Sequence, residues 1–149
     1  MVKLRQMQIS DIAQVMQIEE SVCDYPWTAN IFRDCLLVGY EAWVLVSEKT
    51  LLGYGLLSIA ANEAHVLTIS IKPTHHRQGL GLQLMRHLIQ IATEAKVEQL
   101  LLEVRESNHA AYKLYEQLGF TAIGIRKEYY QTKNGREDAK VLALKFLSA

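Results

Sequence analysis

Half of the 149 residues are hydrophobic, which is enough to build one substantial core. Sixteen basic and sixteen acidic residues cancel, so the overall charge does not indicate nucleic acid or an anionic membrane as the main partner. No apolar run approaches the roughly 20 residues of a membrane-spanning helix, and Met1–Gln8 does not have the pattern of a signal peptide. We therefore expect a cytoplasmic protein with one domain over residues 1–149.

A first strand and two helices are predicted before residue 40. Val2–Met7 is the strand, and Ser10 is the predicted cap of a helix whose apolar residues recur on one face, namely Ile12, Val15, Met16 and Ile18. Thr28 is the predicted N-cap of the second helix. Trp27 before that cap and Phe32 after it have the spacing of a hydrophobic staple, which is a structural feature.

The middle of the chain predicts strands and then a long helix. Three stretches rich in β-branched and aromatic residues suggest an antiparallel meander: Ala42–Ser47, Leu51–Ile59 and Glu63–Ile71. After Pro73 the apolar period becomes helical over Gly79–Lys96. The nearly all-apolar Leu100–Val104 is typical of a buried strand. A crossover helix between two strands predicts that this strand lies parallel to Glu63–Ile71.

The last part of the chain predicts one helix and a hairpin. The helix is Asn108–Leu118, with Ser107 as its cap and Gly119 where a left-handed residue usually ends a helix. The hairpin consists of Thr121–Tyr129 and Ala139–Phe146, with Asn134-Gly135 in its connection. The predicted fold class is α/β, a mixed sheet that is mostly antiparallel with one parallel pair and has helices on both faces.

The most informative motif is His76–Gly81, which follows a strand and opens the long helix. Its two glycines allow the backbone to approach a ligand closely. The first N–H groups of a helix lack partners and lie at the positive end of its dipole, so this stretch is a candidate pyrophosphate site. The sequence has no Gly-Lys-Ser/Thr, which a nucleotide P-loop would need, and it has Leu84 where a dinucleotide fingerprint would need a small residue. Both of these motifs are therefore disfavoured. The alternative is a glycine-containing helix start without a ligand.

Four blocks have the order and spacing found in a known family: Thr68–Pro73, Arg77–Gly81, Leu101–Asn108 and Ala111–Phe120. They resemble the GCN5-related N-acetyltransferase (GNAT) superfamily. Tyr25–Thr28 and Arg126–Asp138 further resemble its RimI type, which acetylates the N-terminal alanine of a small-subunit ribosomal protein, the eighteenth. His76 departs from the family motif, which usually has Gln or Arg there. We expect a modest effect on cofactor affinity, because backbone N–H groups do most of the binding.

The resemblance implies the GNAT fold and the use of acetyl-CoA as co-substrate. The residues that it implies for acetyl-CoA binding are Ile69, Ser70, Ile71, Arg77, Gln78, Gly79, Leu80, Gly81, Leu82 and Asn108. Residues 69–71 would offer backbone groups to the pantetheine arm and the thioester carbonyl, and their side chains can belong to the core. Asn108 is alternatively a polar residue at a helix start.

Attack on a thioester needs a neutral amine, a polarised carbonyl and a way to protonate the departing thiolate. Glu103 is the candidate base, because it interrupts the apolar run Leu100–Val104 and burial there would disfavour its charged form. The family resemblance also places the base here. The alternative is an ion pair with Arg105, which lies two residues along the same strand face.

Tyr115 is the candidate acid. It follows Asn108 by two helical turns, so both side chains can point to one groove. A phenol with a pKa of about 10 protonates a thiolate whose conjugate acid has a pKa of about 8.5 only with favourable positioning. The alternative is an aromatic residue that packs its helix on the sheet.

Other polar residues have two interpretations each. Four acidic residues either attract a basic peptide or form a solvated face: Glu19, Glu20, Asp24 and Asp34. Tyr129 and Tyr130 either wall a peptide groove or are ordinary strand aromatics. We predict no metal, because the histidines have no metal-ligand spacing: His65, His75, His76, His87 and His109. Cys23 and Cys35 are expected to be reduced thiols.

The leading hypothesis is direct transfer, in a ternary complex, from acetyl-CoA to the N-terminal alanine of the ribosomal protein. Its α-amine, with a pKa of about 8, is easier to deprotonate than a lysine with a pKa of about 10.4. The implied partner is the basic N-terminal peptide of that protein, with no direct nucleic-acid or membrane contact, and the enzyme would be a monomer or weak dimer. The alternatives are acetylation of a lysine, polyamine or other small amine, and a non-catalytic acetyl-CoA-binding module.

Overall fold

The structure is a computed structural model that describes residues 1–146, and it has the predicted mixed α/β architecture. The strands are β1 Val2–Gln6, β2 Glu41–Ser47, β3 Thr50–Ala60, β4 Glu63–Ile71, β5 Gln99–Arg105, β6 Thr121–Thr132 and β7 Gly135–Lys145. The helices are α1 Ile12–Val22, α2 Ala29–Val38, α3 Leu80–Glu94 and α4 His109–Gln117, with two short 3-10 helices, η1 Ile9–Asp11 and η2 Pro73–His75.

The strands are hydrogen-bonded in the order β1-β2-β3-β4-β5-β7-β6. The predicted parallel pair is confirmed, because β4 and β5 run in the same direction with His65 opposite Leu101. The pairs β1–β2, β2–β3, β5–β7 and β6–β7 are antiparallel. Strand β6 leaves its regular register with β7 between Arg126 and Tyr130, so it contains a bulge.

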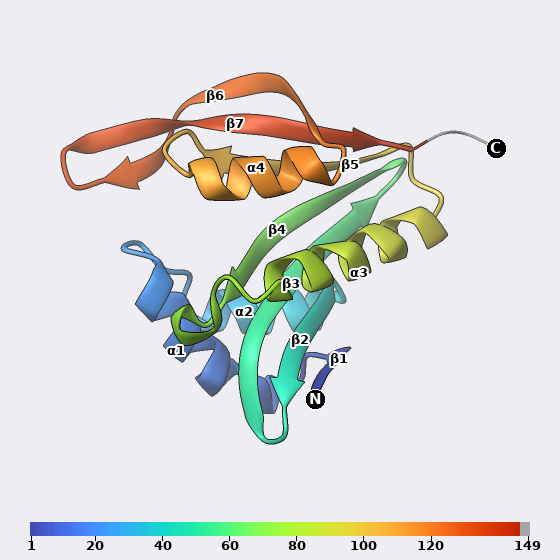
Figure 1. Cartoon of the computed structure of the whole chain (residues 1–149), viewed down its shortest axis with the longest axis vertical. Helices are drawn as coiled ribbons and strands as arrows, with labels where there is room; N and C mark the ends of the chain where they lie inside the picture. Colours follow the sequence, from blue (N-terminus) through green and yellow to red (C-terminus); the bar gives the residue numbers. More distant parts are fainter. Residues whose placement is uncertain (147–149) are drawn as a thin grey trace. The chain divides into compact units, whose positions relative to one another are not determined.

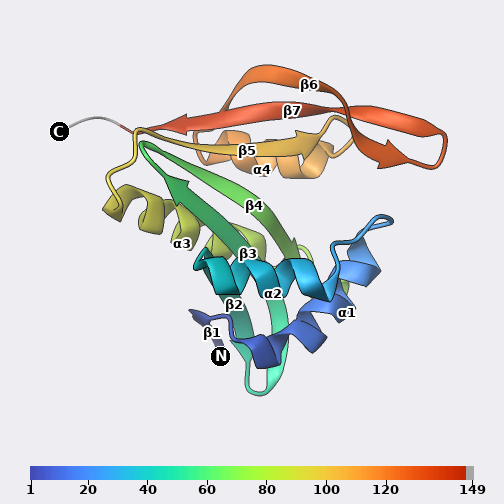
Figure 2. The same ribbon diagram turned by 180° about the vertical axis from the view of Figure 1, so that it is seen from behind.

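The chain packs as two compact units. The first unit contains residues 1–58 and 67–91. Its strands have α1 and α2 on one face and α3 on the other (Figures 1 and 2). Val15, Phe32 and Tyr54 are fully buried on the α1–α2 side, and Leu45 and Leu84 are fully buried on the α3 side. Helices on both faces, as the sequence predicts, are therefore present within this unit.

The second unit contains residues 59–66 and the chain from residue 92 onward. Helix α4 lies along one face of the sheet formed by β5, β7 and β6 (Figures 1 and 2). The helix is followed by Gly119, whose φ of +101° is in the left-handed region, as the sequence predicts. Tyr115 on α4 then packs edge-to-face on Phe120, with 5.8 Å between the ring centroids. These contacts fix the position of α4 on its sheet.

Helix starts in the first unit confirm one prediction and correct another. The Thr28 hydroxyl accepts the Ile31 N–H at 3.2 Å, so Thr28 is the N-cap of α2. The Trp27 and Phe32 rings form the predicted staple, with centroids 5.2 Å apart. Ser10, in contrast, is not a cap. Residues 9–11 form η1, where the carboxylate of Asp11 accepts the Gln8 N–H at 2.7 Å. None of the helices in residues 1–146 has the length and apolar character needed to cross a membrane.

Candidate active site

The end of β4 belongs to the first unit and contains Ile69, Ser70 and Ile71, which are half-buried. Ile69 and Ile71 pack against the core on the α3 side, so these side chains do belong to the core. Gly53 of β3 approaches this segment closely. A Cβ on Gly53 would lie 2.9 Å from the Ser70 carbonyl oxygen, which is shorter than van der Waals contact. Glycine at position 53 therefore allows β3 and β4 to approach each other here.

The predicted phosphate loop also lies in the first unit, between η2 and α3. Arg77 and Gly79 both have positive φ, +65° and +78°, just before the helix begins at Leu80. The Gln83 N–H donates to the Gly79 carbonyl at 3.1 Å and closes the first helical turn. The N–H groups of residues 80–82 precede that bond and are available to an anion, as at other helix N-termini. Positive φ next to a helix start is typical of anion-binding backbone nests.

His76, which departs from the family motif, has a local contact. Its Nε2–H donates to the carbonyl oxygen of Ile71 at 2.7 Å. The loop is thereby tied to the end of β4. Neighbouring Arg77, Gln78 and Gly79 are exposed, and a Cβ built on Gly79 would meet no atom within 4 Å. The exposed loop backbone is thus open on the side of Gly79.

Glu103 lies on β5 in the second unit, and its side chain is only 7% exposed. Both of its carboxylate oxygens have partners: Oε2 lies 2.5 Å from His65 Nε2, and Oε1 lies 3.2 Å from Arg126 Nε. The alternative prediction of an ion pair with Arg105 is wrong. Arg105 instead pairs with Glu137 of β7, with Nη1 and Oε1 2.8 Å apart. Glu103 is therefore a buried carboxylate between an imidazole and a guanidinium.

Tyr115 lies on α4, and only 8% of this residue is exposed. Burial raises the pKa of Tyr115 to about 12, so the phenol is protonated at neutral pH. The Tyr115 ring packs on Phe120, so the alternative prediction of an aromatic packing residue is correct for the ring.

Asn108 is exposed and is itself the N-cap of α4, where its side-chain oxygen accepts the Ala111 N–H at 3.2 Å. The prediction that Ser107 caps this helix is wrong. Ser107 directs both its N–H and its hydroxyl to the carboxylate of Glu137, each at 3.2 Å. Asn108 therefore has the structural role that the sequence left as an alternative, with its side chain still at the surface.

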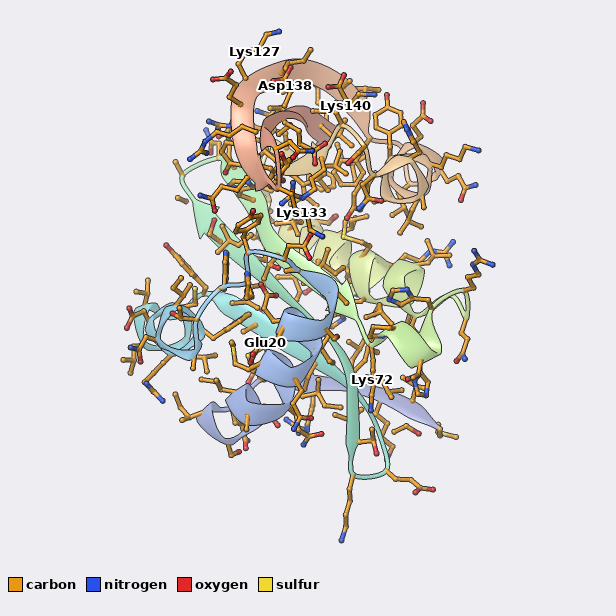
Figure 3. All side chains as sticks on the ribbon, turned by 90° about the vertical axis from the view of Figure 1, so that its left-hand side faces the viewer. Glu20, Lys72, Lys127, Lys133, Asp138 and Lys140 are labelled. Atoms are coloured by element: carbon orange, nitrogen blue, oxygen red, sulfur yellow. The ribbon has the colours of Figure 1, made fainter. Side chains whose placement is uncertain are left out.

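The β6 bulge brings aromatic and basic residues to the surroundings of Glu103. Burial and the nearby negative charge of Glu103 raise the pKa of Tyr130, and the Arg105 guanidinium lies over the Tyr130 ring at 4.4 Å. Asp138 of β7 accepts the Glu128 N–H at 2.9 Å and lies 3.6 Å from the ammonium of Lys127 (Figure 3). Asp138 thus supports the irregular backbone that follows Arg126 in β6.

The acidic residues near the N-terminal helices do not form one surface. Glu19 is buried at 3% exposure and accepts hydrogen bonds from the Tyr54 hydroxyl and, at 2.9 Å, from the Trp27 N–H. Both interpretations of the sequence are therefore wrong for Glu19. Glu20, Asp24 and Asp34 are exposed, and Glu20 projects from α1 (Figure 3).

Sequence reasoning missed His65 and Arg126 as neighbours of Glu103. His65 is found only once the register of the parallel pair is known, because it lies opposite Leu101, which shares a strand face with Glu103. Arg126 lies one strand further away, opposite Ala139 of β7, so its contact with Glu103 depends on the registers of both β5–β7 and β6–β7. Within residues 1–146, no group of three or more His, Cys, Asp or Glu side chains is placed to hold a metal ion.

Comparisons with known proteins agree with this arrangement. The Acetyltransferase (GNAT) family model matches residues 9–120. An Escherichia coli relative named ribosomal protein bS18-alanine N-acetyltransferase is 36% identical over 138 residues, covering 93% of each chain. A Bacillus subtilis relative, provisionally given the same name, is 41% identical over 141 residues, covering 93% of this chain and 92% of that protein.

A solved structure is similar over the whole length of the chain. The crystal structure of the ribosomal-protein-S18-alanine N-acetyltransferase from Escherichia coli has a TM-score of 0.93 at 34% identity, covering 100% of this chain and 96% of that one. The family model, the sequence identity and the structural similarity lead to one conclusion. This protein belongs to the Acetyltransferase (GNAT) family.

Proposed function

We propose that this protein transfers the acetyl group of acetyl-CoA to the N-terminal alanine of ribosomal protein bS18, in the cytoplasm. The observation that carries the proposal is the identity of 36% over 93% of the chain to a relative named for this activity. We further propose that residues 1–149 act as one catalytic domain.

In this proposal the start of α3, the end of β4 and Asn108 bind acetyl-CoA. The N–H groups of residues 80–82, together with the loop Arg77–Gly79, hold the pyrophosphate at the positive end of the α3 dipole. Backbone groups of Ile69, Ser70 and Ile71 hydrogen-bond the pantetheine arm, since the Ile69 and Ile71 side chains pack against the core. Asn108 offers an exposed amide to the cofactor while its oxygen caps α4.

Glu103 is the proposed base for the amine. An α-ammonium must lose one proton before its nitrogen attacks the thioester carbon, and a second proton leaves as the C–N bond forms and the C–S bond breaks. A carboxylate that takes up such a proton contributes on the order of 10²-fold or more to the rate. Exposed Glu20, Asp24 and Asp34 of the first unit supply negative charge for a basic peptide.

Tyr115 is the proposed hydrogen-bond donor to the departing thiolate. With a pKa of about 12, it is a much weaker acid than a thiol of pKa about 8.5, and full proton transfer to the thiolate would cost roughly 5 kcal/mol. A hydrogen bond from the phenol stabilises the thiolate without that cost. We therefore assign Tyr115 to donation of a hydrogen bond, with the proton itself supplied later by solvent.

The substrate is tested with two peptides and mass spectrometry. One is the basic N-terminal peptide of bS18, beginning with alanine, and the other is its N-terminally blocked counterpart containing a lysine. We expect acetyl-CoA-dependent acetylation of the free α-amine only. Modification of the blocked peptide would favour a lysine or small-amine acetyltransferase, and modification of neither would favour a binding module.

The base is tested with Glu103→Gln. We expect kcat/KM to fall by on the order of 10²-fold at pH 7 and by less at pH 9, where more of the α-amine is already neutral. An equal loss at both pH values would assign Glu103 a structural role. Affinity for acetyl-CoA, measured by calorimetry, should be unchanged.

A further inference from the structure

We propose that His65 is a positioning residue for Glu103, which fixes the carboxylate of the proposed base by a hydrogen bond from its imidazole. This inference rests on the proposed role of Glu103 as base. It concerns a residue of β4 that the family motifs quoted above do not contain.

The position of His65 follows from the pairing of β4 with β5. His65 lies opposite Leu101 in the parallel register, and Glu103 is on the same face of β5 as Leu101. The imidazole reaches forward along this face until Nε2 is 2.5 Å from Oε2 of Glu103. A carboxylate oxygen accepts at this distance, so Nε2 carries the proton that is shared by the pair.

The two residues differ strongly in exposure. The side chain of Glu103 is 7% exposed, while that of His65 is 35% exposed. Arg126 occupies the other oxygen of Glu103, so both oxygens have partners. His65 Nε2 lies closer to its carboxylate oxygen than Arg126 Nε does to the other, at 2.5 Å against 3.2 Å.

The hydrogen bond from His65 has a direct consequence for Glu103. It holds one carboxylate oxygen at a fixed point, and the orientation of a carboxylate decides how well it takes up a proton from the amine. The other groups near Glu103 are Arg126 and Tyr130 of β6, and Arg105 on the same face of β5.

The experiment compares the wild type with His65→Gln and His65→Leu, with the alanine peptide as substrate. Glutamine keeps an N–H donor without a variable charge, and leucine removes the donor. We expect His65→Leu to lower kcat by roughly tenfold, part of the contribution of the base, while KM for acetyl-CoA is unchanged. His65→Gln should keep kcat at pH 8 within about threefold of the wild type.

Rescue by glutamine separates positioning from a merely structural role. A loss of kcat in His65→Gln as large as that in His65→Leu, with both variants folded, would overturn the inference. Exposed His109 provides the matched control, and His109→Gln should keep the wild-type kcat and KM.

A double-mutant cycle tests whether His65 acts through Glu103. In a Glu103→Gln background, His65→Leu should reduce kcat/KM by less than about twofold, because the residue that it positions is already gone. If the losses in kcat/KM from the two substitutions multiply, His65 does not act through Glu103. That result would overturn the inference but would not affect the proposed role of Glu103 as base. Full activity of Glu103→Gln by itself would overturn the proposed base and this inference with it. Thermal unfolding of each variant shows whether it is folded.

Discussion

The partners of Glu103 show how a single residue is placed by competition among neighbours. Arg105 shares a strand face with Glu103, but the cross-strand carboxylate of Glu137 takes its guanidinium instead. Ala139 lies opposite Arg105, and Glu137 lies diagonally across, two residues along β7. Diagonal neighbours on adjacent strands are within reach of long side chains such as arginine. Because Arg105 pairs with Glu137, the partners of Glu103 are Arg126 at Oε1 and His65 at Oε2.

Tyr115→Phe tests the proposed hydrogen bond to the thiolate. The substitution keeps the ring that packs on Phe120 and removes only the hydroxyl. We expect kcat to fall by on the order of tenfold to a hundredfold, because one preorganised donor is lost. Acetyl-CoA affinity by calorimetry should stay at the wild-type value.

Two outcomes would contradict this assignment of Tyr115. A collapse of acetyl-CoA affinity in the phenylalanine variant would make the hydroxyl a cofactor ligand. Unchanged kcat would leave Tyr115 with its packing role alone. A kcat that recovers when a substrate with a more acidic leaving thiol is supplied would support the donor role, since such a thiolate needs less stabilisation.

At the scale of elements, the backbones of β3 and the end of β4 approach each other too closely for a side chain at Gly53. The missing side chain of Gly53 lets the Ser70 carbonyl approach, and the Lys72 N–H donates to the Leu52 carbonyl at 2.7 Å just beyond it. The segment proposed to bind pantetheine is therefore held by backbone contacts. Its geometry depends on a residue that lies in a different strand.

Gly53→Ala tests this dependence. The added methyl group would lie 2.5 Å from Ile71 Cδ1 and 2.9 Å from the Ser70 oxygen, and the backbone atom cannot move away cheaply. We expect a loss of about 1–3 kcal/mol in the free energy of unfolding, as for other overpacked sites. Acetyl-CoA affinity should fall as well. Denaturant titration and calorimetry measure the two effects.

Gly124→Ala on β6 is the matched control for this substitution. A Cβ at Gly124 meets no atom within 4 Å, and its φ is not in the left-handed region. Its stability should therefore match the wild type or exceed it slightly. Equal changes in the free energy of unfolding for the two substitutions would mean that the close approach of β3 to β4 does not affect stability.

At the scale of the whole molecule, buried tyrosines make stability depend on alkaline pH. Burial raises the pKa of Tyr115 to about 12, and burial also raises the pKa values of Tyr54 and Tyr130. In the unfolded chain each phenol ionises at a pKa of about 10. The unfolded state therefore loses protons that the folded state retains. The contribution of these tyrosines to stability is full below pH 10 and is lost as the pH rises toward 12.

Denaturant unfolding at pH 8, 10 and 11, followed by circular dichroism, checks this prediction. We expect the free energy of unfolding to decrease between pH 10 and pH 11. The decrease should be smaller in Tyr115→Phe, which lacks one of the three phenols. A wild-type stability that is the same at pH 8 and pH 11 would contradict the raised pKa values.

The sequence by itself determined the order and type of the helices and strands, the Thr28 cap, the left-handed Gly119 and the parallel pairing of β4 with β5. These features depend on apolar period, local hydrogen bonding and the handedness of a crossover, which neighbouring residues carry. The glycine-containing start of α3 was predictable for the same reason, since it lies within one short segment.

Only the tertiary structure decided the partners of the charged residues. Burial of Glu19 depends on Tyr54 from β3, and the surroundings of Glu103 depend on β4 and β6. Strand register sets the contacts of Glu103, and a shift of one residue would send each of these strand side chains to the opposite face. Such pairings join residues far apart in sequence, so no local pattern of residue types specifies them.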